Sequence, residues 1–187
     1  MDKWILKGNR VVLPEGESSV SLVIAENTIE SIEPHDFQLD NLTQTTVDVV
    51  DVEEAIIMPG LIDLHVHINE PGRTEWEGFD TATQAAAAGG ITTLVDMPLN
   101  SSPVTTTTGN FQKKLDAASG KLVVDVAYHA GVIPEHVDHL DQVLEMGAIA
   151  GKAFMIDSGI DDFPFADRET LREAMLVLKK HNKPLLA

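Results

Sequence analysis

The alternation of apolar strands and helices that begins near residue 55 constrains this chain more than any other feature. Near-continuous apolar segments predict strands at 55–68, 91–97, 121–132, 148–156 and 183–187. Helical patterns fill the intervals between these strands, at 75–90, 108–120, 134–147 and 167–182. Strands that are apolar on both faces and separated by helices form a parallel sheet covered by helices.

Two architectures satisfy this pattern: an open doubly wound sheet and a (β/α)8 barrel. No Gly-x-Gly-x-x-Gly follows a strand, so a dinucleotide-binding sheet has little support. Four strand–helix units and the start of a fifth strand precede Ala187, whereas a barrel needs eight units and about 250 residues. The expectation is therefore either an open sheet or the first half of a barrel that is truncated in strand 5.

Residues 1–55 have a different sequence pattern, with short segments rich in β-branched residues separated by turn residues. The expected strands cover 3–8, 10–14, 19–25, 28–33 and 46–53. We predict a small antiparallel sheet here, and hence a division of the chain into 1–55 and 56–187.

Composition excludes several classes of protein. The formal net charge is −17, from 30 acidic and 13 basic residues, which argues against a nucleic-acid partner. No apolar run reaches the roughly 18 residues of a membrane span, and the N-terminus does not resemble a signal peptide. A cytoplasmic protein is expected, with a peroxisomal or mitochondrial one as the alternative. The chain has no cysteine, so a metal would have to bind histidine, carboxylate or a modified lysine.

His65 and His67 lie two residues apart on the predicted strand 55–68. Side chains alternate between the faces of a strand, so both imidazoles point the same way. Imidazole is a good ligand for zinc and similar metals, which makes this pair a candidate metal site. Two satisfied core histidines are the alternative interpretation.

Lys152 is the only charged residue of the predicted strand 148–156. A lysine in such a strand either extends its amine to solvent at the strand end or is desolvated. A desolvated, neutral amine can react with carbon dioxide to give a carbamate, an anionic ligand able to bridge two metals.

Other polar residues carry weaker signals. Asp96 ends a strand and is interpreted as a loop cap. His129, also at a strand end, is a candidate for contact with a metal ligand or with the substrate. His35, His136 and His139 are expected to be inert.

Several motifs in order carry a family resemblance: His65-Val-His67, Glu70-Pro-Gly-Arg73, Trp76-Glu-Gly, the segment 85–100, and Lys152. With them, essentially the whole chain resembles the amidohydrolase superfamily, and more narrowly its cyclic amidases: allantoinases, dihydroorotases and dihydropyrimidinases.

That resemblance implies a distorted (β/α)8 barrel with a binuclear centre of two Zn²⁺ or other divalent ions bridged by a hydroxide. His65 and His67 would hold the more buried metal, and carboxylated Lys152 would bridge both. Two further histidines and the general-base aspartate would lie beyond Ala187. Residues 1–55 would form part of a flanking β-sandwich.

The substrate class follows from differences within the resemblance. Dihydroorotase-like chains have an arginine two residues after the second histidine and an asparagine directly after Met-Pro, which together bind a carboxylate. This chain has Asn69 and Leu99 there, so a neutral hydantoin ring is expected. The segments 70–73 and 97–100 resemble allantoinases, which implies hydrolysis of (S)-allantoin to allantoate in purine catabolism. Asn69, Arg73 and Asn100 are candidate substrate contacts.

These expectations have consequences and rivals. The partner would be a small ureide or hydantoin, and the complete protein would form a homo-oligomer, a tetramer by resemblance. The 187-residue chain alone is expected to be inactive and prone to aggregation. The rivals are a dihydropyrimidinase- or dihydroorotase-type cyclic amidase, a non-catalytic dihydropyrimidinase-related scaffold, and an open-sheet binding module unrelated to metals.

Overall fold

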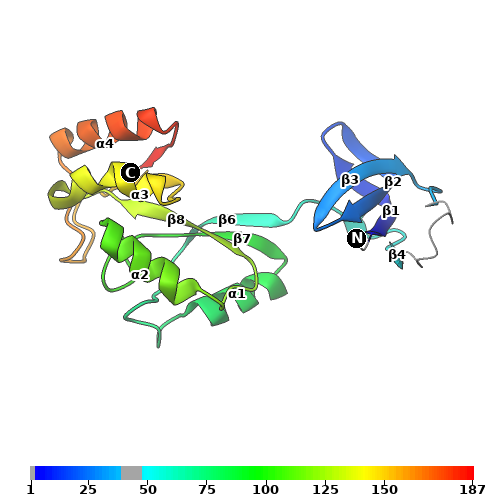
Figure 1. Cartoon of the computed structure of the whole chain (residues 1–187), viewed down its shortest axis with the longest axis horizontal. Coiled ribbons are helices and arrows are strands. Elements are labelled where there is room, and N and C mark those ends of the chain that lie inside the picture. The colour runs from blue at the N-terminus through cyan, green and yellow to red at the C-terminus, as the bar shows by residue number, and fades with distance from the viewer. Residues whose placement is uncertain (1–2, 39–47) are drawn as a thin grey trace. The chain divides into compact units, whose positions relative to one another are not determined.

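The computed structural model describes residues 3–38 and 48–187 (Figure 1). The chain divides into two compact units, Met1–Pro59 and Gly60–Ala187. No helix in the described part is long and apolar enough to cross a bilayer.

The first unit is a five-stranded sheet. β1 (Lys3–Leu13), β2 (Gly16–Ala25) and β3 (Thr28–Pro34) form an antiparallel meander, as predicted. β4 (Asp48–Asp51) and β5 (Ile56–Ile57) instead pair with β1 in parallel. The sheet is therefore mixed and not wholly antiparallel, because these two strands add to the edge of β1 that β2 leaves free.

One predicted turn in this unit is wrong. The segments 3–8 and 10–14 were expected as separate strands, but β1 runs through both, with a bulge between Gly8 and Val11. The Asn9 amide donates to the Glu53 carbonyl across the bulge at 2.8 Å, which keeps the segment paired. Residues 46 and 47 of the expected strand 46–53 lie outside the described residues.

The second unit is a parallel sheet with the strand order β10-β9-β8-β7-β6. Its strands are β6 (Leu61–Val66), β7 (Ile91–Asp96), β8 (Asp125–Gly131), β9 (Ala150–Lys152) and β10 (Leu185–Leu186). Its helices are α1 (Phe79–Ala88), α2 (Thr108–Ala118), the 3-10 helix η1 (Pro134–His139), α3 (Leu140–Glu145) and α4 (Arg168–Lys180). Strands pair in sequence order with helices between them, which confirms the predicted α/β alternation.

The predicted strand 55–68 is divided in the structure. Ile56–Ile57 pairs within the first unit, and Leu61–Val66 enters the parallel sheet. Pro59 has no N–H to give to a ladder, and a Cβ on Gly60 would lie 2.1 Å from the Thr92 hydroxyl. The strand ends at Val66, so His67 lies just beyond it.

The core of the second unit joins helices to the sheet through aromatic contacts. Tyr128 on β8 meets Phe79 of α1 and Phe111 of α2 edge-on, at 6.2 and 5.9 Å between ring centroids. Both phenylalanines are fully buried. These contacts hold the carboxyl ends of the central strands in register beneath the loops that follow them.

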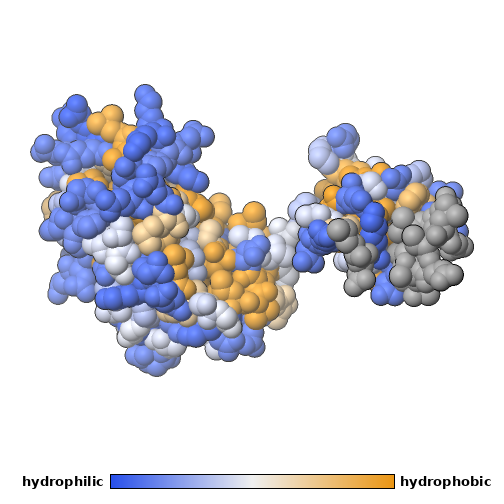
Figure 2. Space-filling view, in the orientation of Figure 1, coloured by the Kyte–Doolittle hydropathy of each residue, from blue (hydrophilic) through white to orange (hydrophobic). Residues whose placement is uncertain are grey.

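The β6 edge of the parallel sheet is apolar and uncovered. Leu61, Ile62 and Leu64 are 53%, 60% and 61% exposed, and Figure 2 shows hydrophobic surface over the region of β6 and β7. An apolar strand edge of this kind is a site for pairing or aggregation.

A charged cluster joins α3 to the C-terminal end of α4 and makes stability depend on pH. Asp141 accepts hydrogen bonds from His181 at 2.6 Å and from Lys180 at 2.9 Å, and these bonds hold the pKa of its carboxyl below the ordinary value. A lowered folded-state pKa gives stability that is present above the unfolded pKa and is lost as pH falls through the folded-state pKa.

Asp141→Asn should therefore lower the urea midpoint at pH 7 but not at about pH 2.5. Asp138→Asn, an exposed change on η1, is the control, and an equal loss at both pH values would contradict the assignment.

Candidate metal centre

The carboxyl ends of the parallel strands bring the chemically active side chains to one edge. Val66 is in register with Asp96, and Asp96 with Tyr128. On the other side of β8, Gly131 is in register with Lys152. His65, His129 and Lys152 therefore belong to the edge at which the sites of such sheets form.

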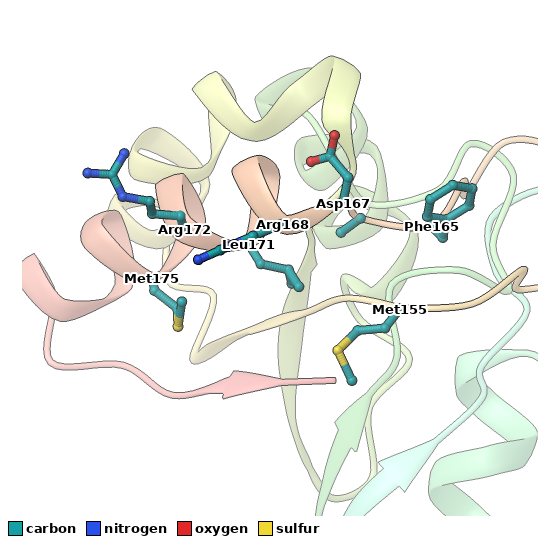
Figure 3. A pocket seen from close by; sticks show the side chains of 8 residues that line it. Met155, Phe165, Asp167, Arg168, Leu171, Arg172 and Met175 are labelled. Carbon is teal, nitrogen blue, oxygen red and sulfur yellow. The ribbon is translucent and has the colours of Figure 1, made fainter.

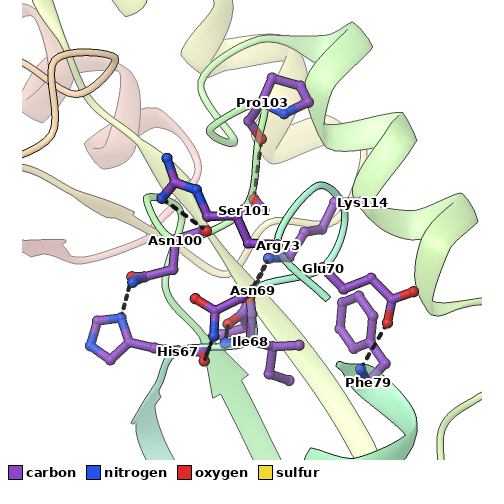
Figure 4. Close-up of polar contacts among 11 residues, drawn as sticks. His67, Ile68, Asn69, Glu70, Arg73, Phe79, Asn100, Ser101, Pro103 and Lys114 are labelled. Atoms are coloured by element: carbon purple, nitrogen blue, oxygen red, sulfur yellow. Dashed lines mark hydrogen bonds and ion pairs between the residues drawn. The ribbon is translucent and has the colours of Figure 1, made fainter. Parts of the chain in front are cut away.

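His65 and His67 lie together, as expected from their spacing. Their ring centroids are 5.1 Å apart and the ring planes are inclined by 52°. Both side chains are exposed at the end of β6. The Nδ1 atom of His67 lies 2.5 Å from Oδ1 of Asn100, which follows β7 (Figure 4). An imidazole whose Nδ1 hydrogen is donated in this way presents the Nε2 lone pair outward.

Lys152 ends β9 among small buried residues. Ala150 and Ala153 are 2% and 0% exposed, and the lysine itself is half-buried. Its amine lies 4.6 Å from the centre of the Phe154 ring. Lys152 is thus partly shielded at the strand end, with its amine over an aromatic ring.

His129 lies on β8, which is between β6, the strand of His65, and β9, the strand of Lys152. Burial lowers the pKa of its imidazole, and the nearby side chains of His65 and Lys152 lower it further, whereas the Asp96 backbone opposes the change. Its side chain is 3% exposed, and its Nδ1 has no hydrogen-bond partner within the described part of the chain. Buried polar atoms are normally hydrogen-bonded, so this unpaired nitrogen, next to two candidate ligands, is free to make a further polar contact.

The donor set is compatible with a divalent cation but incomplete. Two imidazoles and an amine that can become a carbamate are suitable ligand chemistry. Within residues 3–38 and 48–187, no three histidine or carboxylate side chains converge into a complete metal site. The described residues therefore offer candidate ligands but do not by themselves form a complete metal site.

The three candidate substrate residues occupy the loops around His67. Asn69 is buried and its amide donates to the His67 carbonyl at 3.3 Å. Arg73 stacks on Trp76, with 5.5 Å from its guanidinium to the ring centre, and donates to the Asn100 carbonyl at 3.5 Å. Arg73 and Asn100 thus lie on adjoining loops (Figure 4), whereas Asn69 bonds to its own loop.

Asp96 has a different role from the loop cap that its sequence position suggested. Its carboxylate is 1% exposed, accepts from the Ile68 amide at 2.7 Å and pairs with Lys114 of α2. Lys114 is equally buried and also donates to the Ile68 carbonyl at 3.1 Å. This ion pair fixes the backbone directly after His67.

Glu70, which the sequence analysis named only as part of the Glu70–Arg73 motif, is a second anchor. Its carboxylate accepts from the Phe79 amide at the start of α1, at 2.9 Å, and pairs with Lys121. A carboxylate at a helix N-terminus satisfies an otherwise unpaired N–H. Glu70 thereby joins the loop after β6 to two other elements.

Two of the histidines expected to be inert, His136 and His139, contact each other. His136 and His139 stack edge-on at 5.8 Å, and His136 contacts the Thr106 hydroxyl at 2.8 Å. Both side chains are half-buried.

A pocket of 560 Å³ lies between α4 and the segment after β9 (Figure 3), and no histidine among the described residues lines it. It is lined by Met155, Phe165, Ala166, Asp167, Arg168, Leu171, Arg172 and Met175. None of these is a candidate site residue.

The sequence of this chain is similar to those of known proteins. Residues 56–187 match the model of the amidohydrolase family. The chain is 45% identical over 171 residues to a protein of Streptomyces avermitilis named allantoinase, covering 91% of this chain and 38% of that protein. It is 42% identical over 188 residues to an allantoinase of Arabidopsis thaliana, covering 99% of this chain and 37% of that protein.

The fold has a solved counterpart. An L-hydantoinase (dihydropyrimidinase) from Arthrobacter aurescens superposes with a TM-score of 0.86 at 24% identity, covering 99% of this chain and 40% of that one. This likeness confirms the predicted fold class, the first half of a (β/α)8 barrel preceded by part of a β-sandwich. The chain spans less than two fifths of the length of the two relatives above.

Proposed function

This chain belongs to the amidohydrolase family, and we propose that the natural polypeptide carrying it is a metal-dependent cyclic amidase that hydrolyses allantoin to allantoate. The observation that carries the proposal is the pair of imidazoles at the carboxyl edge of the sheet, 5.1 Å apart. The contact from His67 to Asn100 supports a metal-ligating role, because it occupies Nδ1 and leaves Nε2 for a cation.

His65, His67 and Lys152 would hold the metal ions. Addition of the unprotonated form of the Lys152 amine to carbon dioxide would form one N–C bond and release one proton to water, and the resulting carbamate would be an oxygen ligand. When bound, divalent cations polarise a substrate carbonyl and lower the pKa of water toward ~7. The remaining ligands and the proton carrier for the leaving nitrogen would come from residues other than those described.

Residues of the two adjoining loops would orient the substrate. The guanidinium of Arg73 is held against Trp76 and the Asn100 carbonyl, so its direction is fixed at the mouth of the site. The Asn100 amide nitrogen can donate to a ureide carbonyl. Asn69 is buried, so of the three proposed residues it would contact the substrate least directly.

Allantoin is proposed over anionic rings for two reasons. Relatives at 42% and 45% identity bear the name allantoinase. Asn69 and Leu99 stand where dihydroorotase-like chains carry the groups that bind a substrate carboxylate, and neither side chain is charged. An anionic ring would therefore lack, at these two positions, the groups that bind its carboxylate, whereas a neutral ring does not need them.

The test is an assay of the purified natural polypeptide with allantoin, dihydrouracil, a 5-substituted hydantoin and dihydroorotate, together with elemental analysis for metals. We expect about two equivalents of divalent metal, as in two-metal hydrolytic sites, and the highest kcat/KM with allantoin. His65→Ala should remove metal and turnover together. His181→Ala, which changes a histidine of the α3–α4 cluster, should retain both.

Other outcomes of this assay would each favour a different function. Preference for dihydrouracil or dihydroorotate would reject allantoin and favour the corresponding cyclic amidase. Absence of both metal and turnover would reject catalysis and favour a scaffold or binding protein.

A further inference from the structure

Asn100 makes an unusually direct contact with the candidate metal ligand His67. The amide oxygen Oδ1 lies 2.5 Å from Nδ1 of the ring, although the two residues are 33 positions apart. An amide oxygen can only accept a hydrogen bond, so the proton in this contact belongs to the imidazole. The neutral ring is then in its Nδ1–H tautomer, and its lone pair lies on Nε2.

The loop that carries Asn100 is held at several points. Met97 donates to the Val66 carbonyl at 2.9 Å, and Ser102 donates to the Pro71 carbonyl at 2.8 Å. The neighbours of Asn100 in sequence, Leu99 and Ser101, are 5% and 0% exposed. The backbone that carries Asn100 is therefore held between the two loops, and its half-buried side chain reaches His67 from this fixed position.

His67 needs such a partner because of where it lies. β6 ends at Val66, whose register partner is Asp96, so His67 lies beyond the last paired residue of the strand. The Asp96–Lys114 pair secures the next residue, Ile68, through both its amide and its carbonyl. These bonds set the backbone of the segment, but they leave the rotation and the tautomer of the His67 ring undetermined.

We infer that Asn100 is a positioning residue that holds His67 in the Nδ1–H tautomer with Nε2 directed at the cation. This inference rests on the proposed function, since it assumes that His67 is a ligand. It assigns the amide oxygen of Asn100 to the metal centre and leaves the amide nitrogen for substrate.

Metal affinity is the first test, measured as Zn²⁺ and Co²⁺ binding by the natural polypeptide. Asn100→Ala should weaken binding by about 10- to 100-fold, the usual effect of removing the partner of a ligating histidine. Asn100→Asp should bind within about threefold of wild type, because a carboxylate oxygen accepts the same bond. Binding by Asn100→Ala equal to wild type would overturn the inference.

Asn110→Ala is the matched control for loop integrity. The Asn110 side chain donates to the Val104 carbonyl at 3.0 Å and so supports the same loop without reaching His67. We expect its metal affinity and its Co²⁺ absorption spectrum to match those of wild type. An equal loss in Asn110→Ala and Asn100→Ala would reduce Asn100 to a structural residue of the loop and reject the inference.

The tautomer itself is measured without metal, by ¹⁵N NMR of histidine-labelled, metal-free protein at a pH where the ring is neutral. His67→Gln assigns the signals by removing them. Wild type should show the Nδ1–H form, and Asn100→Ala should shift toward Nε2–H. A wild type that binds no metal would reject the metal centre alone, and the tautomer would still decide the role of Asn100.

Discussion

Replacing Lys114 by methionine should destabilise the fold by about 3–5 kcal/mol, the usual cost of removing one partner of a buried ion pair. Lys114 and Asp96 are each 1% exposed and lie in contact with one another. Methionine fills similar volume but leaves the Asp96 carboxylate charged and unpaired. The loss therefore comes mainly from the buried charge and only in small part from packing.

Urea unfolding of wild type, Lys114→Met and Lys113→Met measures this effect. Lys113 is the next residue on α2 and is exposed, so its substitution should change stability by less than about 0.5 kcal/mol. Asp96→Asn combined with Lys114→Met should recover most of the loss, because asparagine keeps an acceptor for the Ile68 amide without a charge. Equal stability of Lys113→Met and Lys114→Met would show that the ion pair does not support the fold.

The same variants predict a pH dependence with a definite sign. Burial raises the pKa of the Asp96 carboxyl, and Lys114 opposes that rise. In Lys114→Met the opposition is lost, so the folded-state pKa of Asp96 lies further above its unfolded value of about 3.9. A carboxyl with a raised pKa carries no charge penalty below the unfolded pKa, where it is neutral in both states. The deficit of Lys114→Met should therefore be smaller at about pH 4 than at pH 7.

Lys114 also shows what the sequence could and could not predict. The helix at 108–120 is recognisable from its composition and its glycine stop, and the structure has α2 at Thr108–Ala118. Phe111, Lys114 and Ala118 form its buried face, at the helical spacing of three and four. A lysine on that face was a usable signal for a buried partner. The identity of the partner was not, because Asp96 becomes adjacent only when β7 and α2 pack.

The candidate site, too, could be predicted from the sequence only in part. The spacing of His65 and His67 follows from the two-residue period of a strand, and their rings do lie together. The role of Asn100 depends on how the loop after β7 folds over the end of β6, which no local pattern encodes. Likewise, the division of the segment 55–68 at Pro59 depends on which sheet each half joins.

Replacing Lys152 by alanine in the natural polypeptide should remove bound metal and lower allantoin turnover by about 10³-fold or more. That factor corresponds to about 4 kcal/mol, in the range of the several kcal/mol that metal ions contribute to such reactions. The Lys152 side chain is half-buried at the end of β9, so truncation leaves a gap at the strand end. A short carboxylic acid can enter that gap and supply the oxygen ligand that the carbamate would have provided.

Formate, acetate and propionate are therefore added to Lys152→Ala, and both metal content and turnover are followed. Recovery of both is expected, because a free carboxylate replaces the carbamate oxygen atoms. Lys152→Arg should recover neither, since a guanidinium stays protonated and cannot react with carbon dioxide. Lys183→Ala, an exposed lysine before β10, should keep wild-type metal content and rate. Full metal content and turnover in Lys152→Ala without added acid would show that the amine has no part in the metal centre, because a ligand cannot be removed without loss of binding.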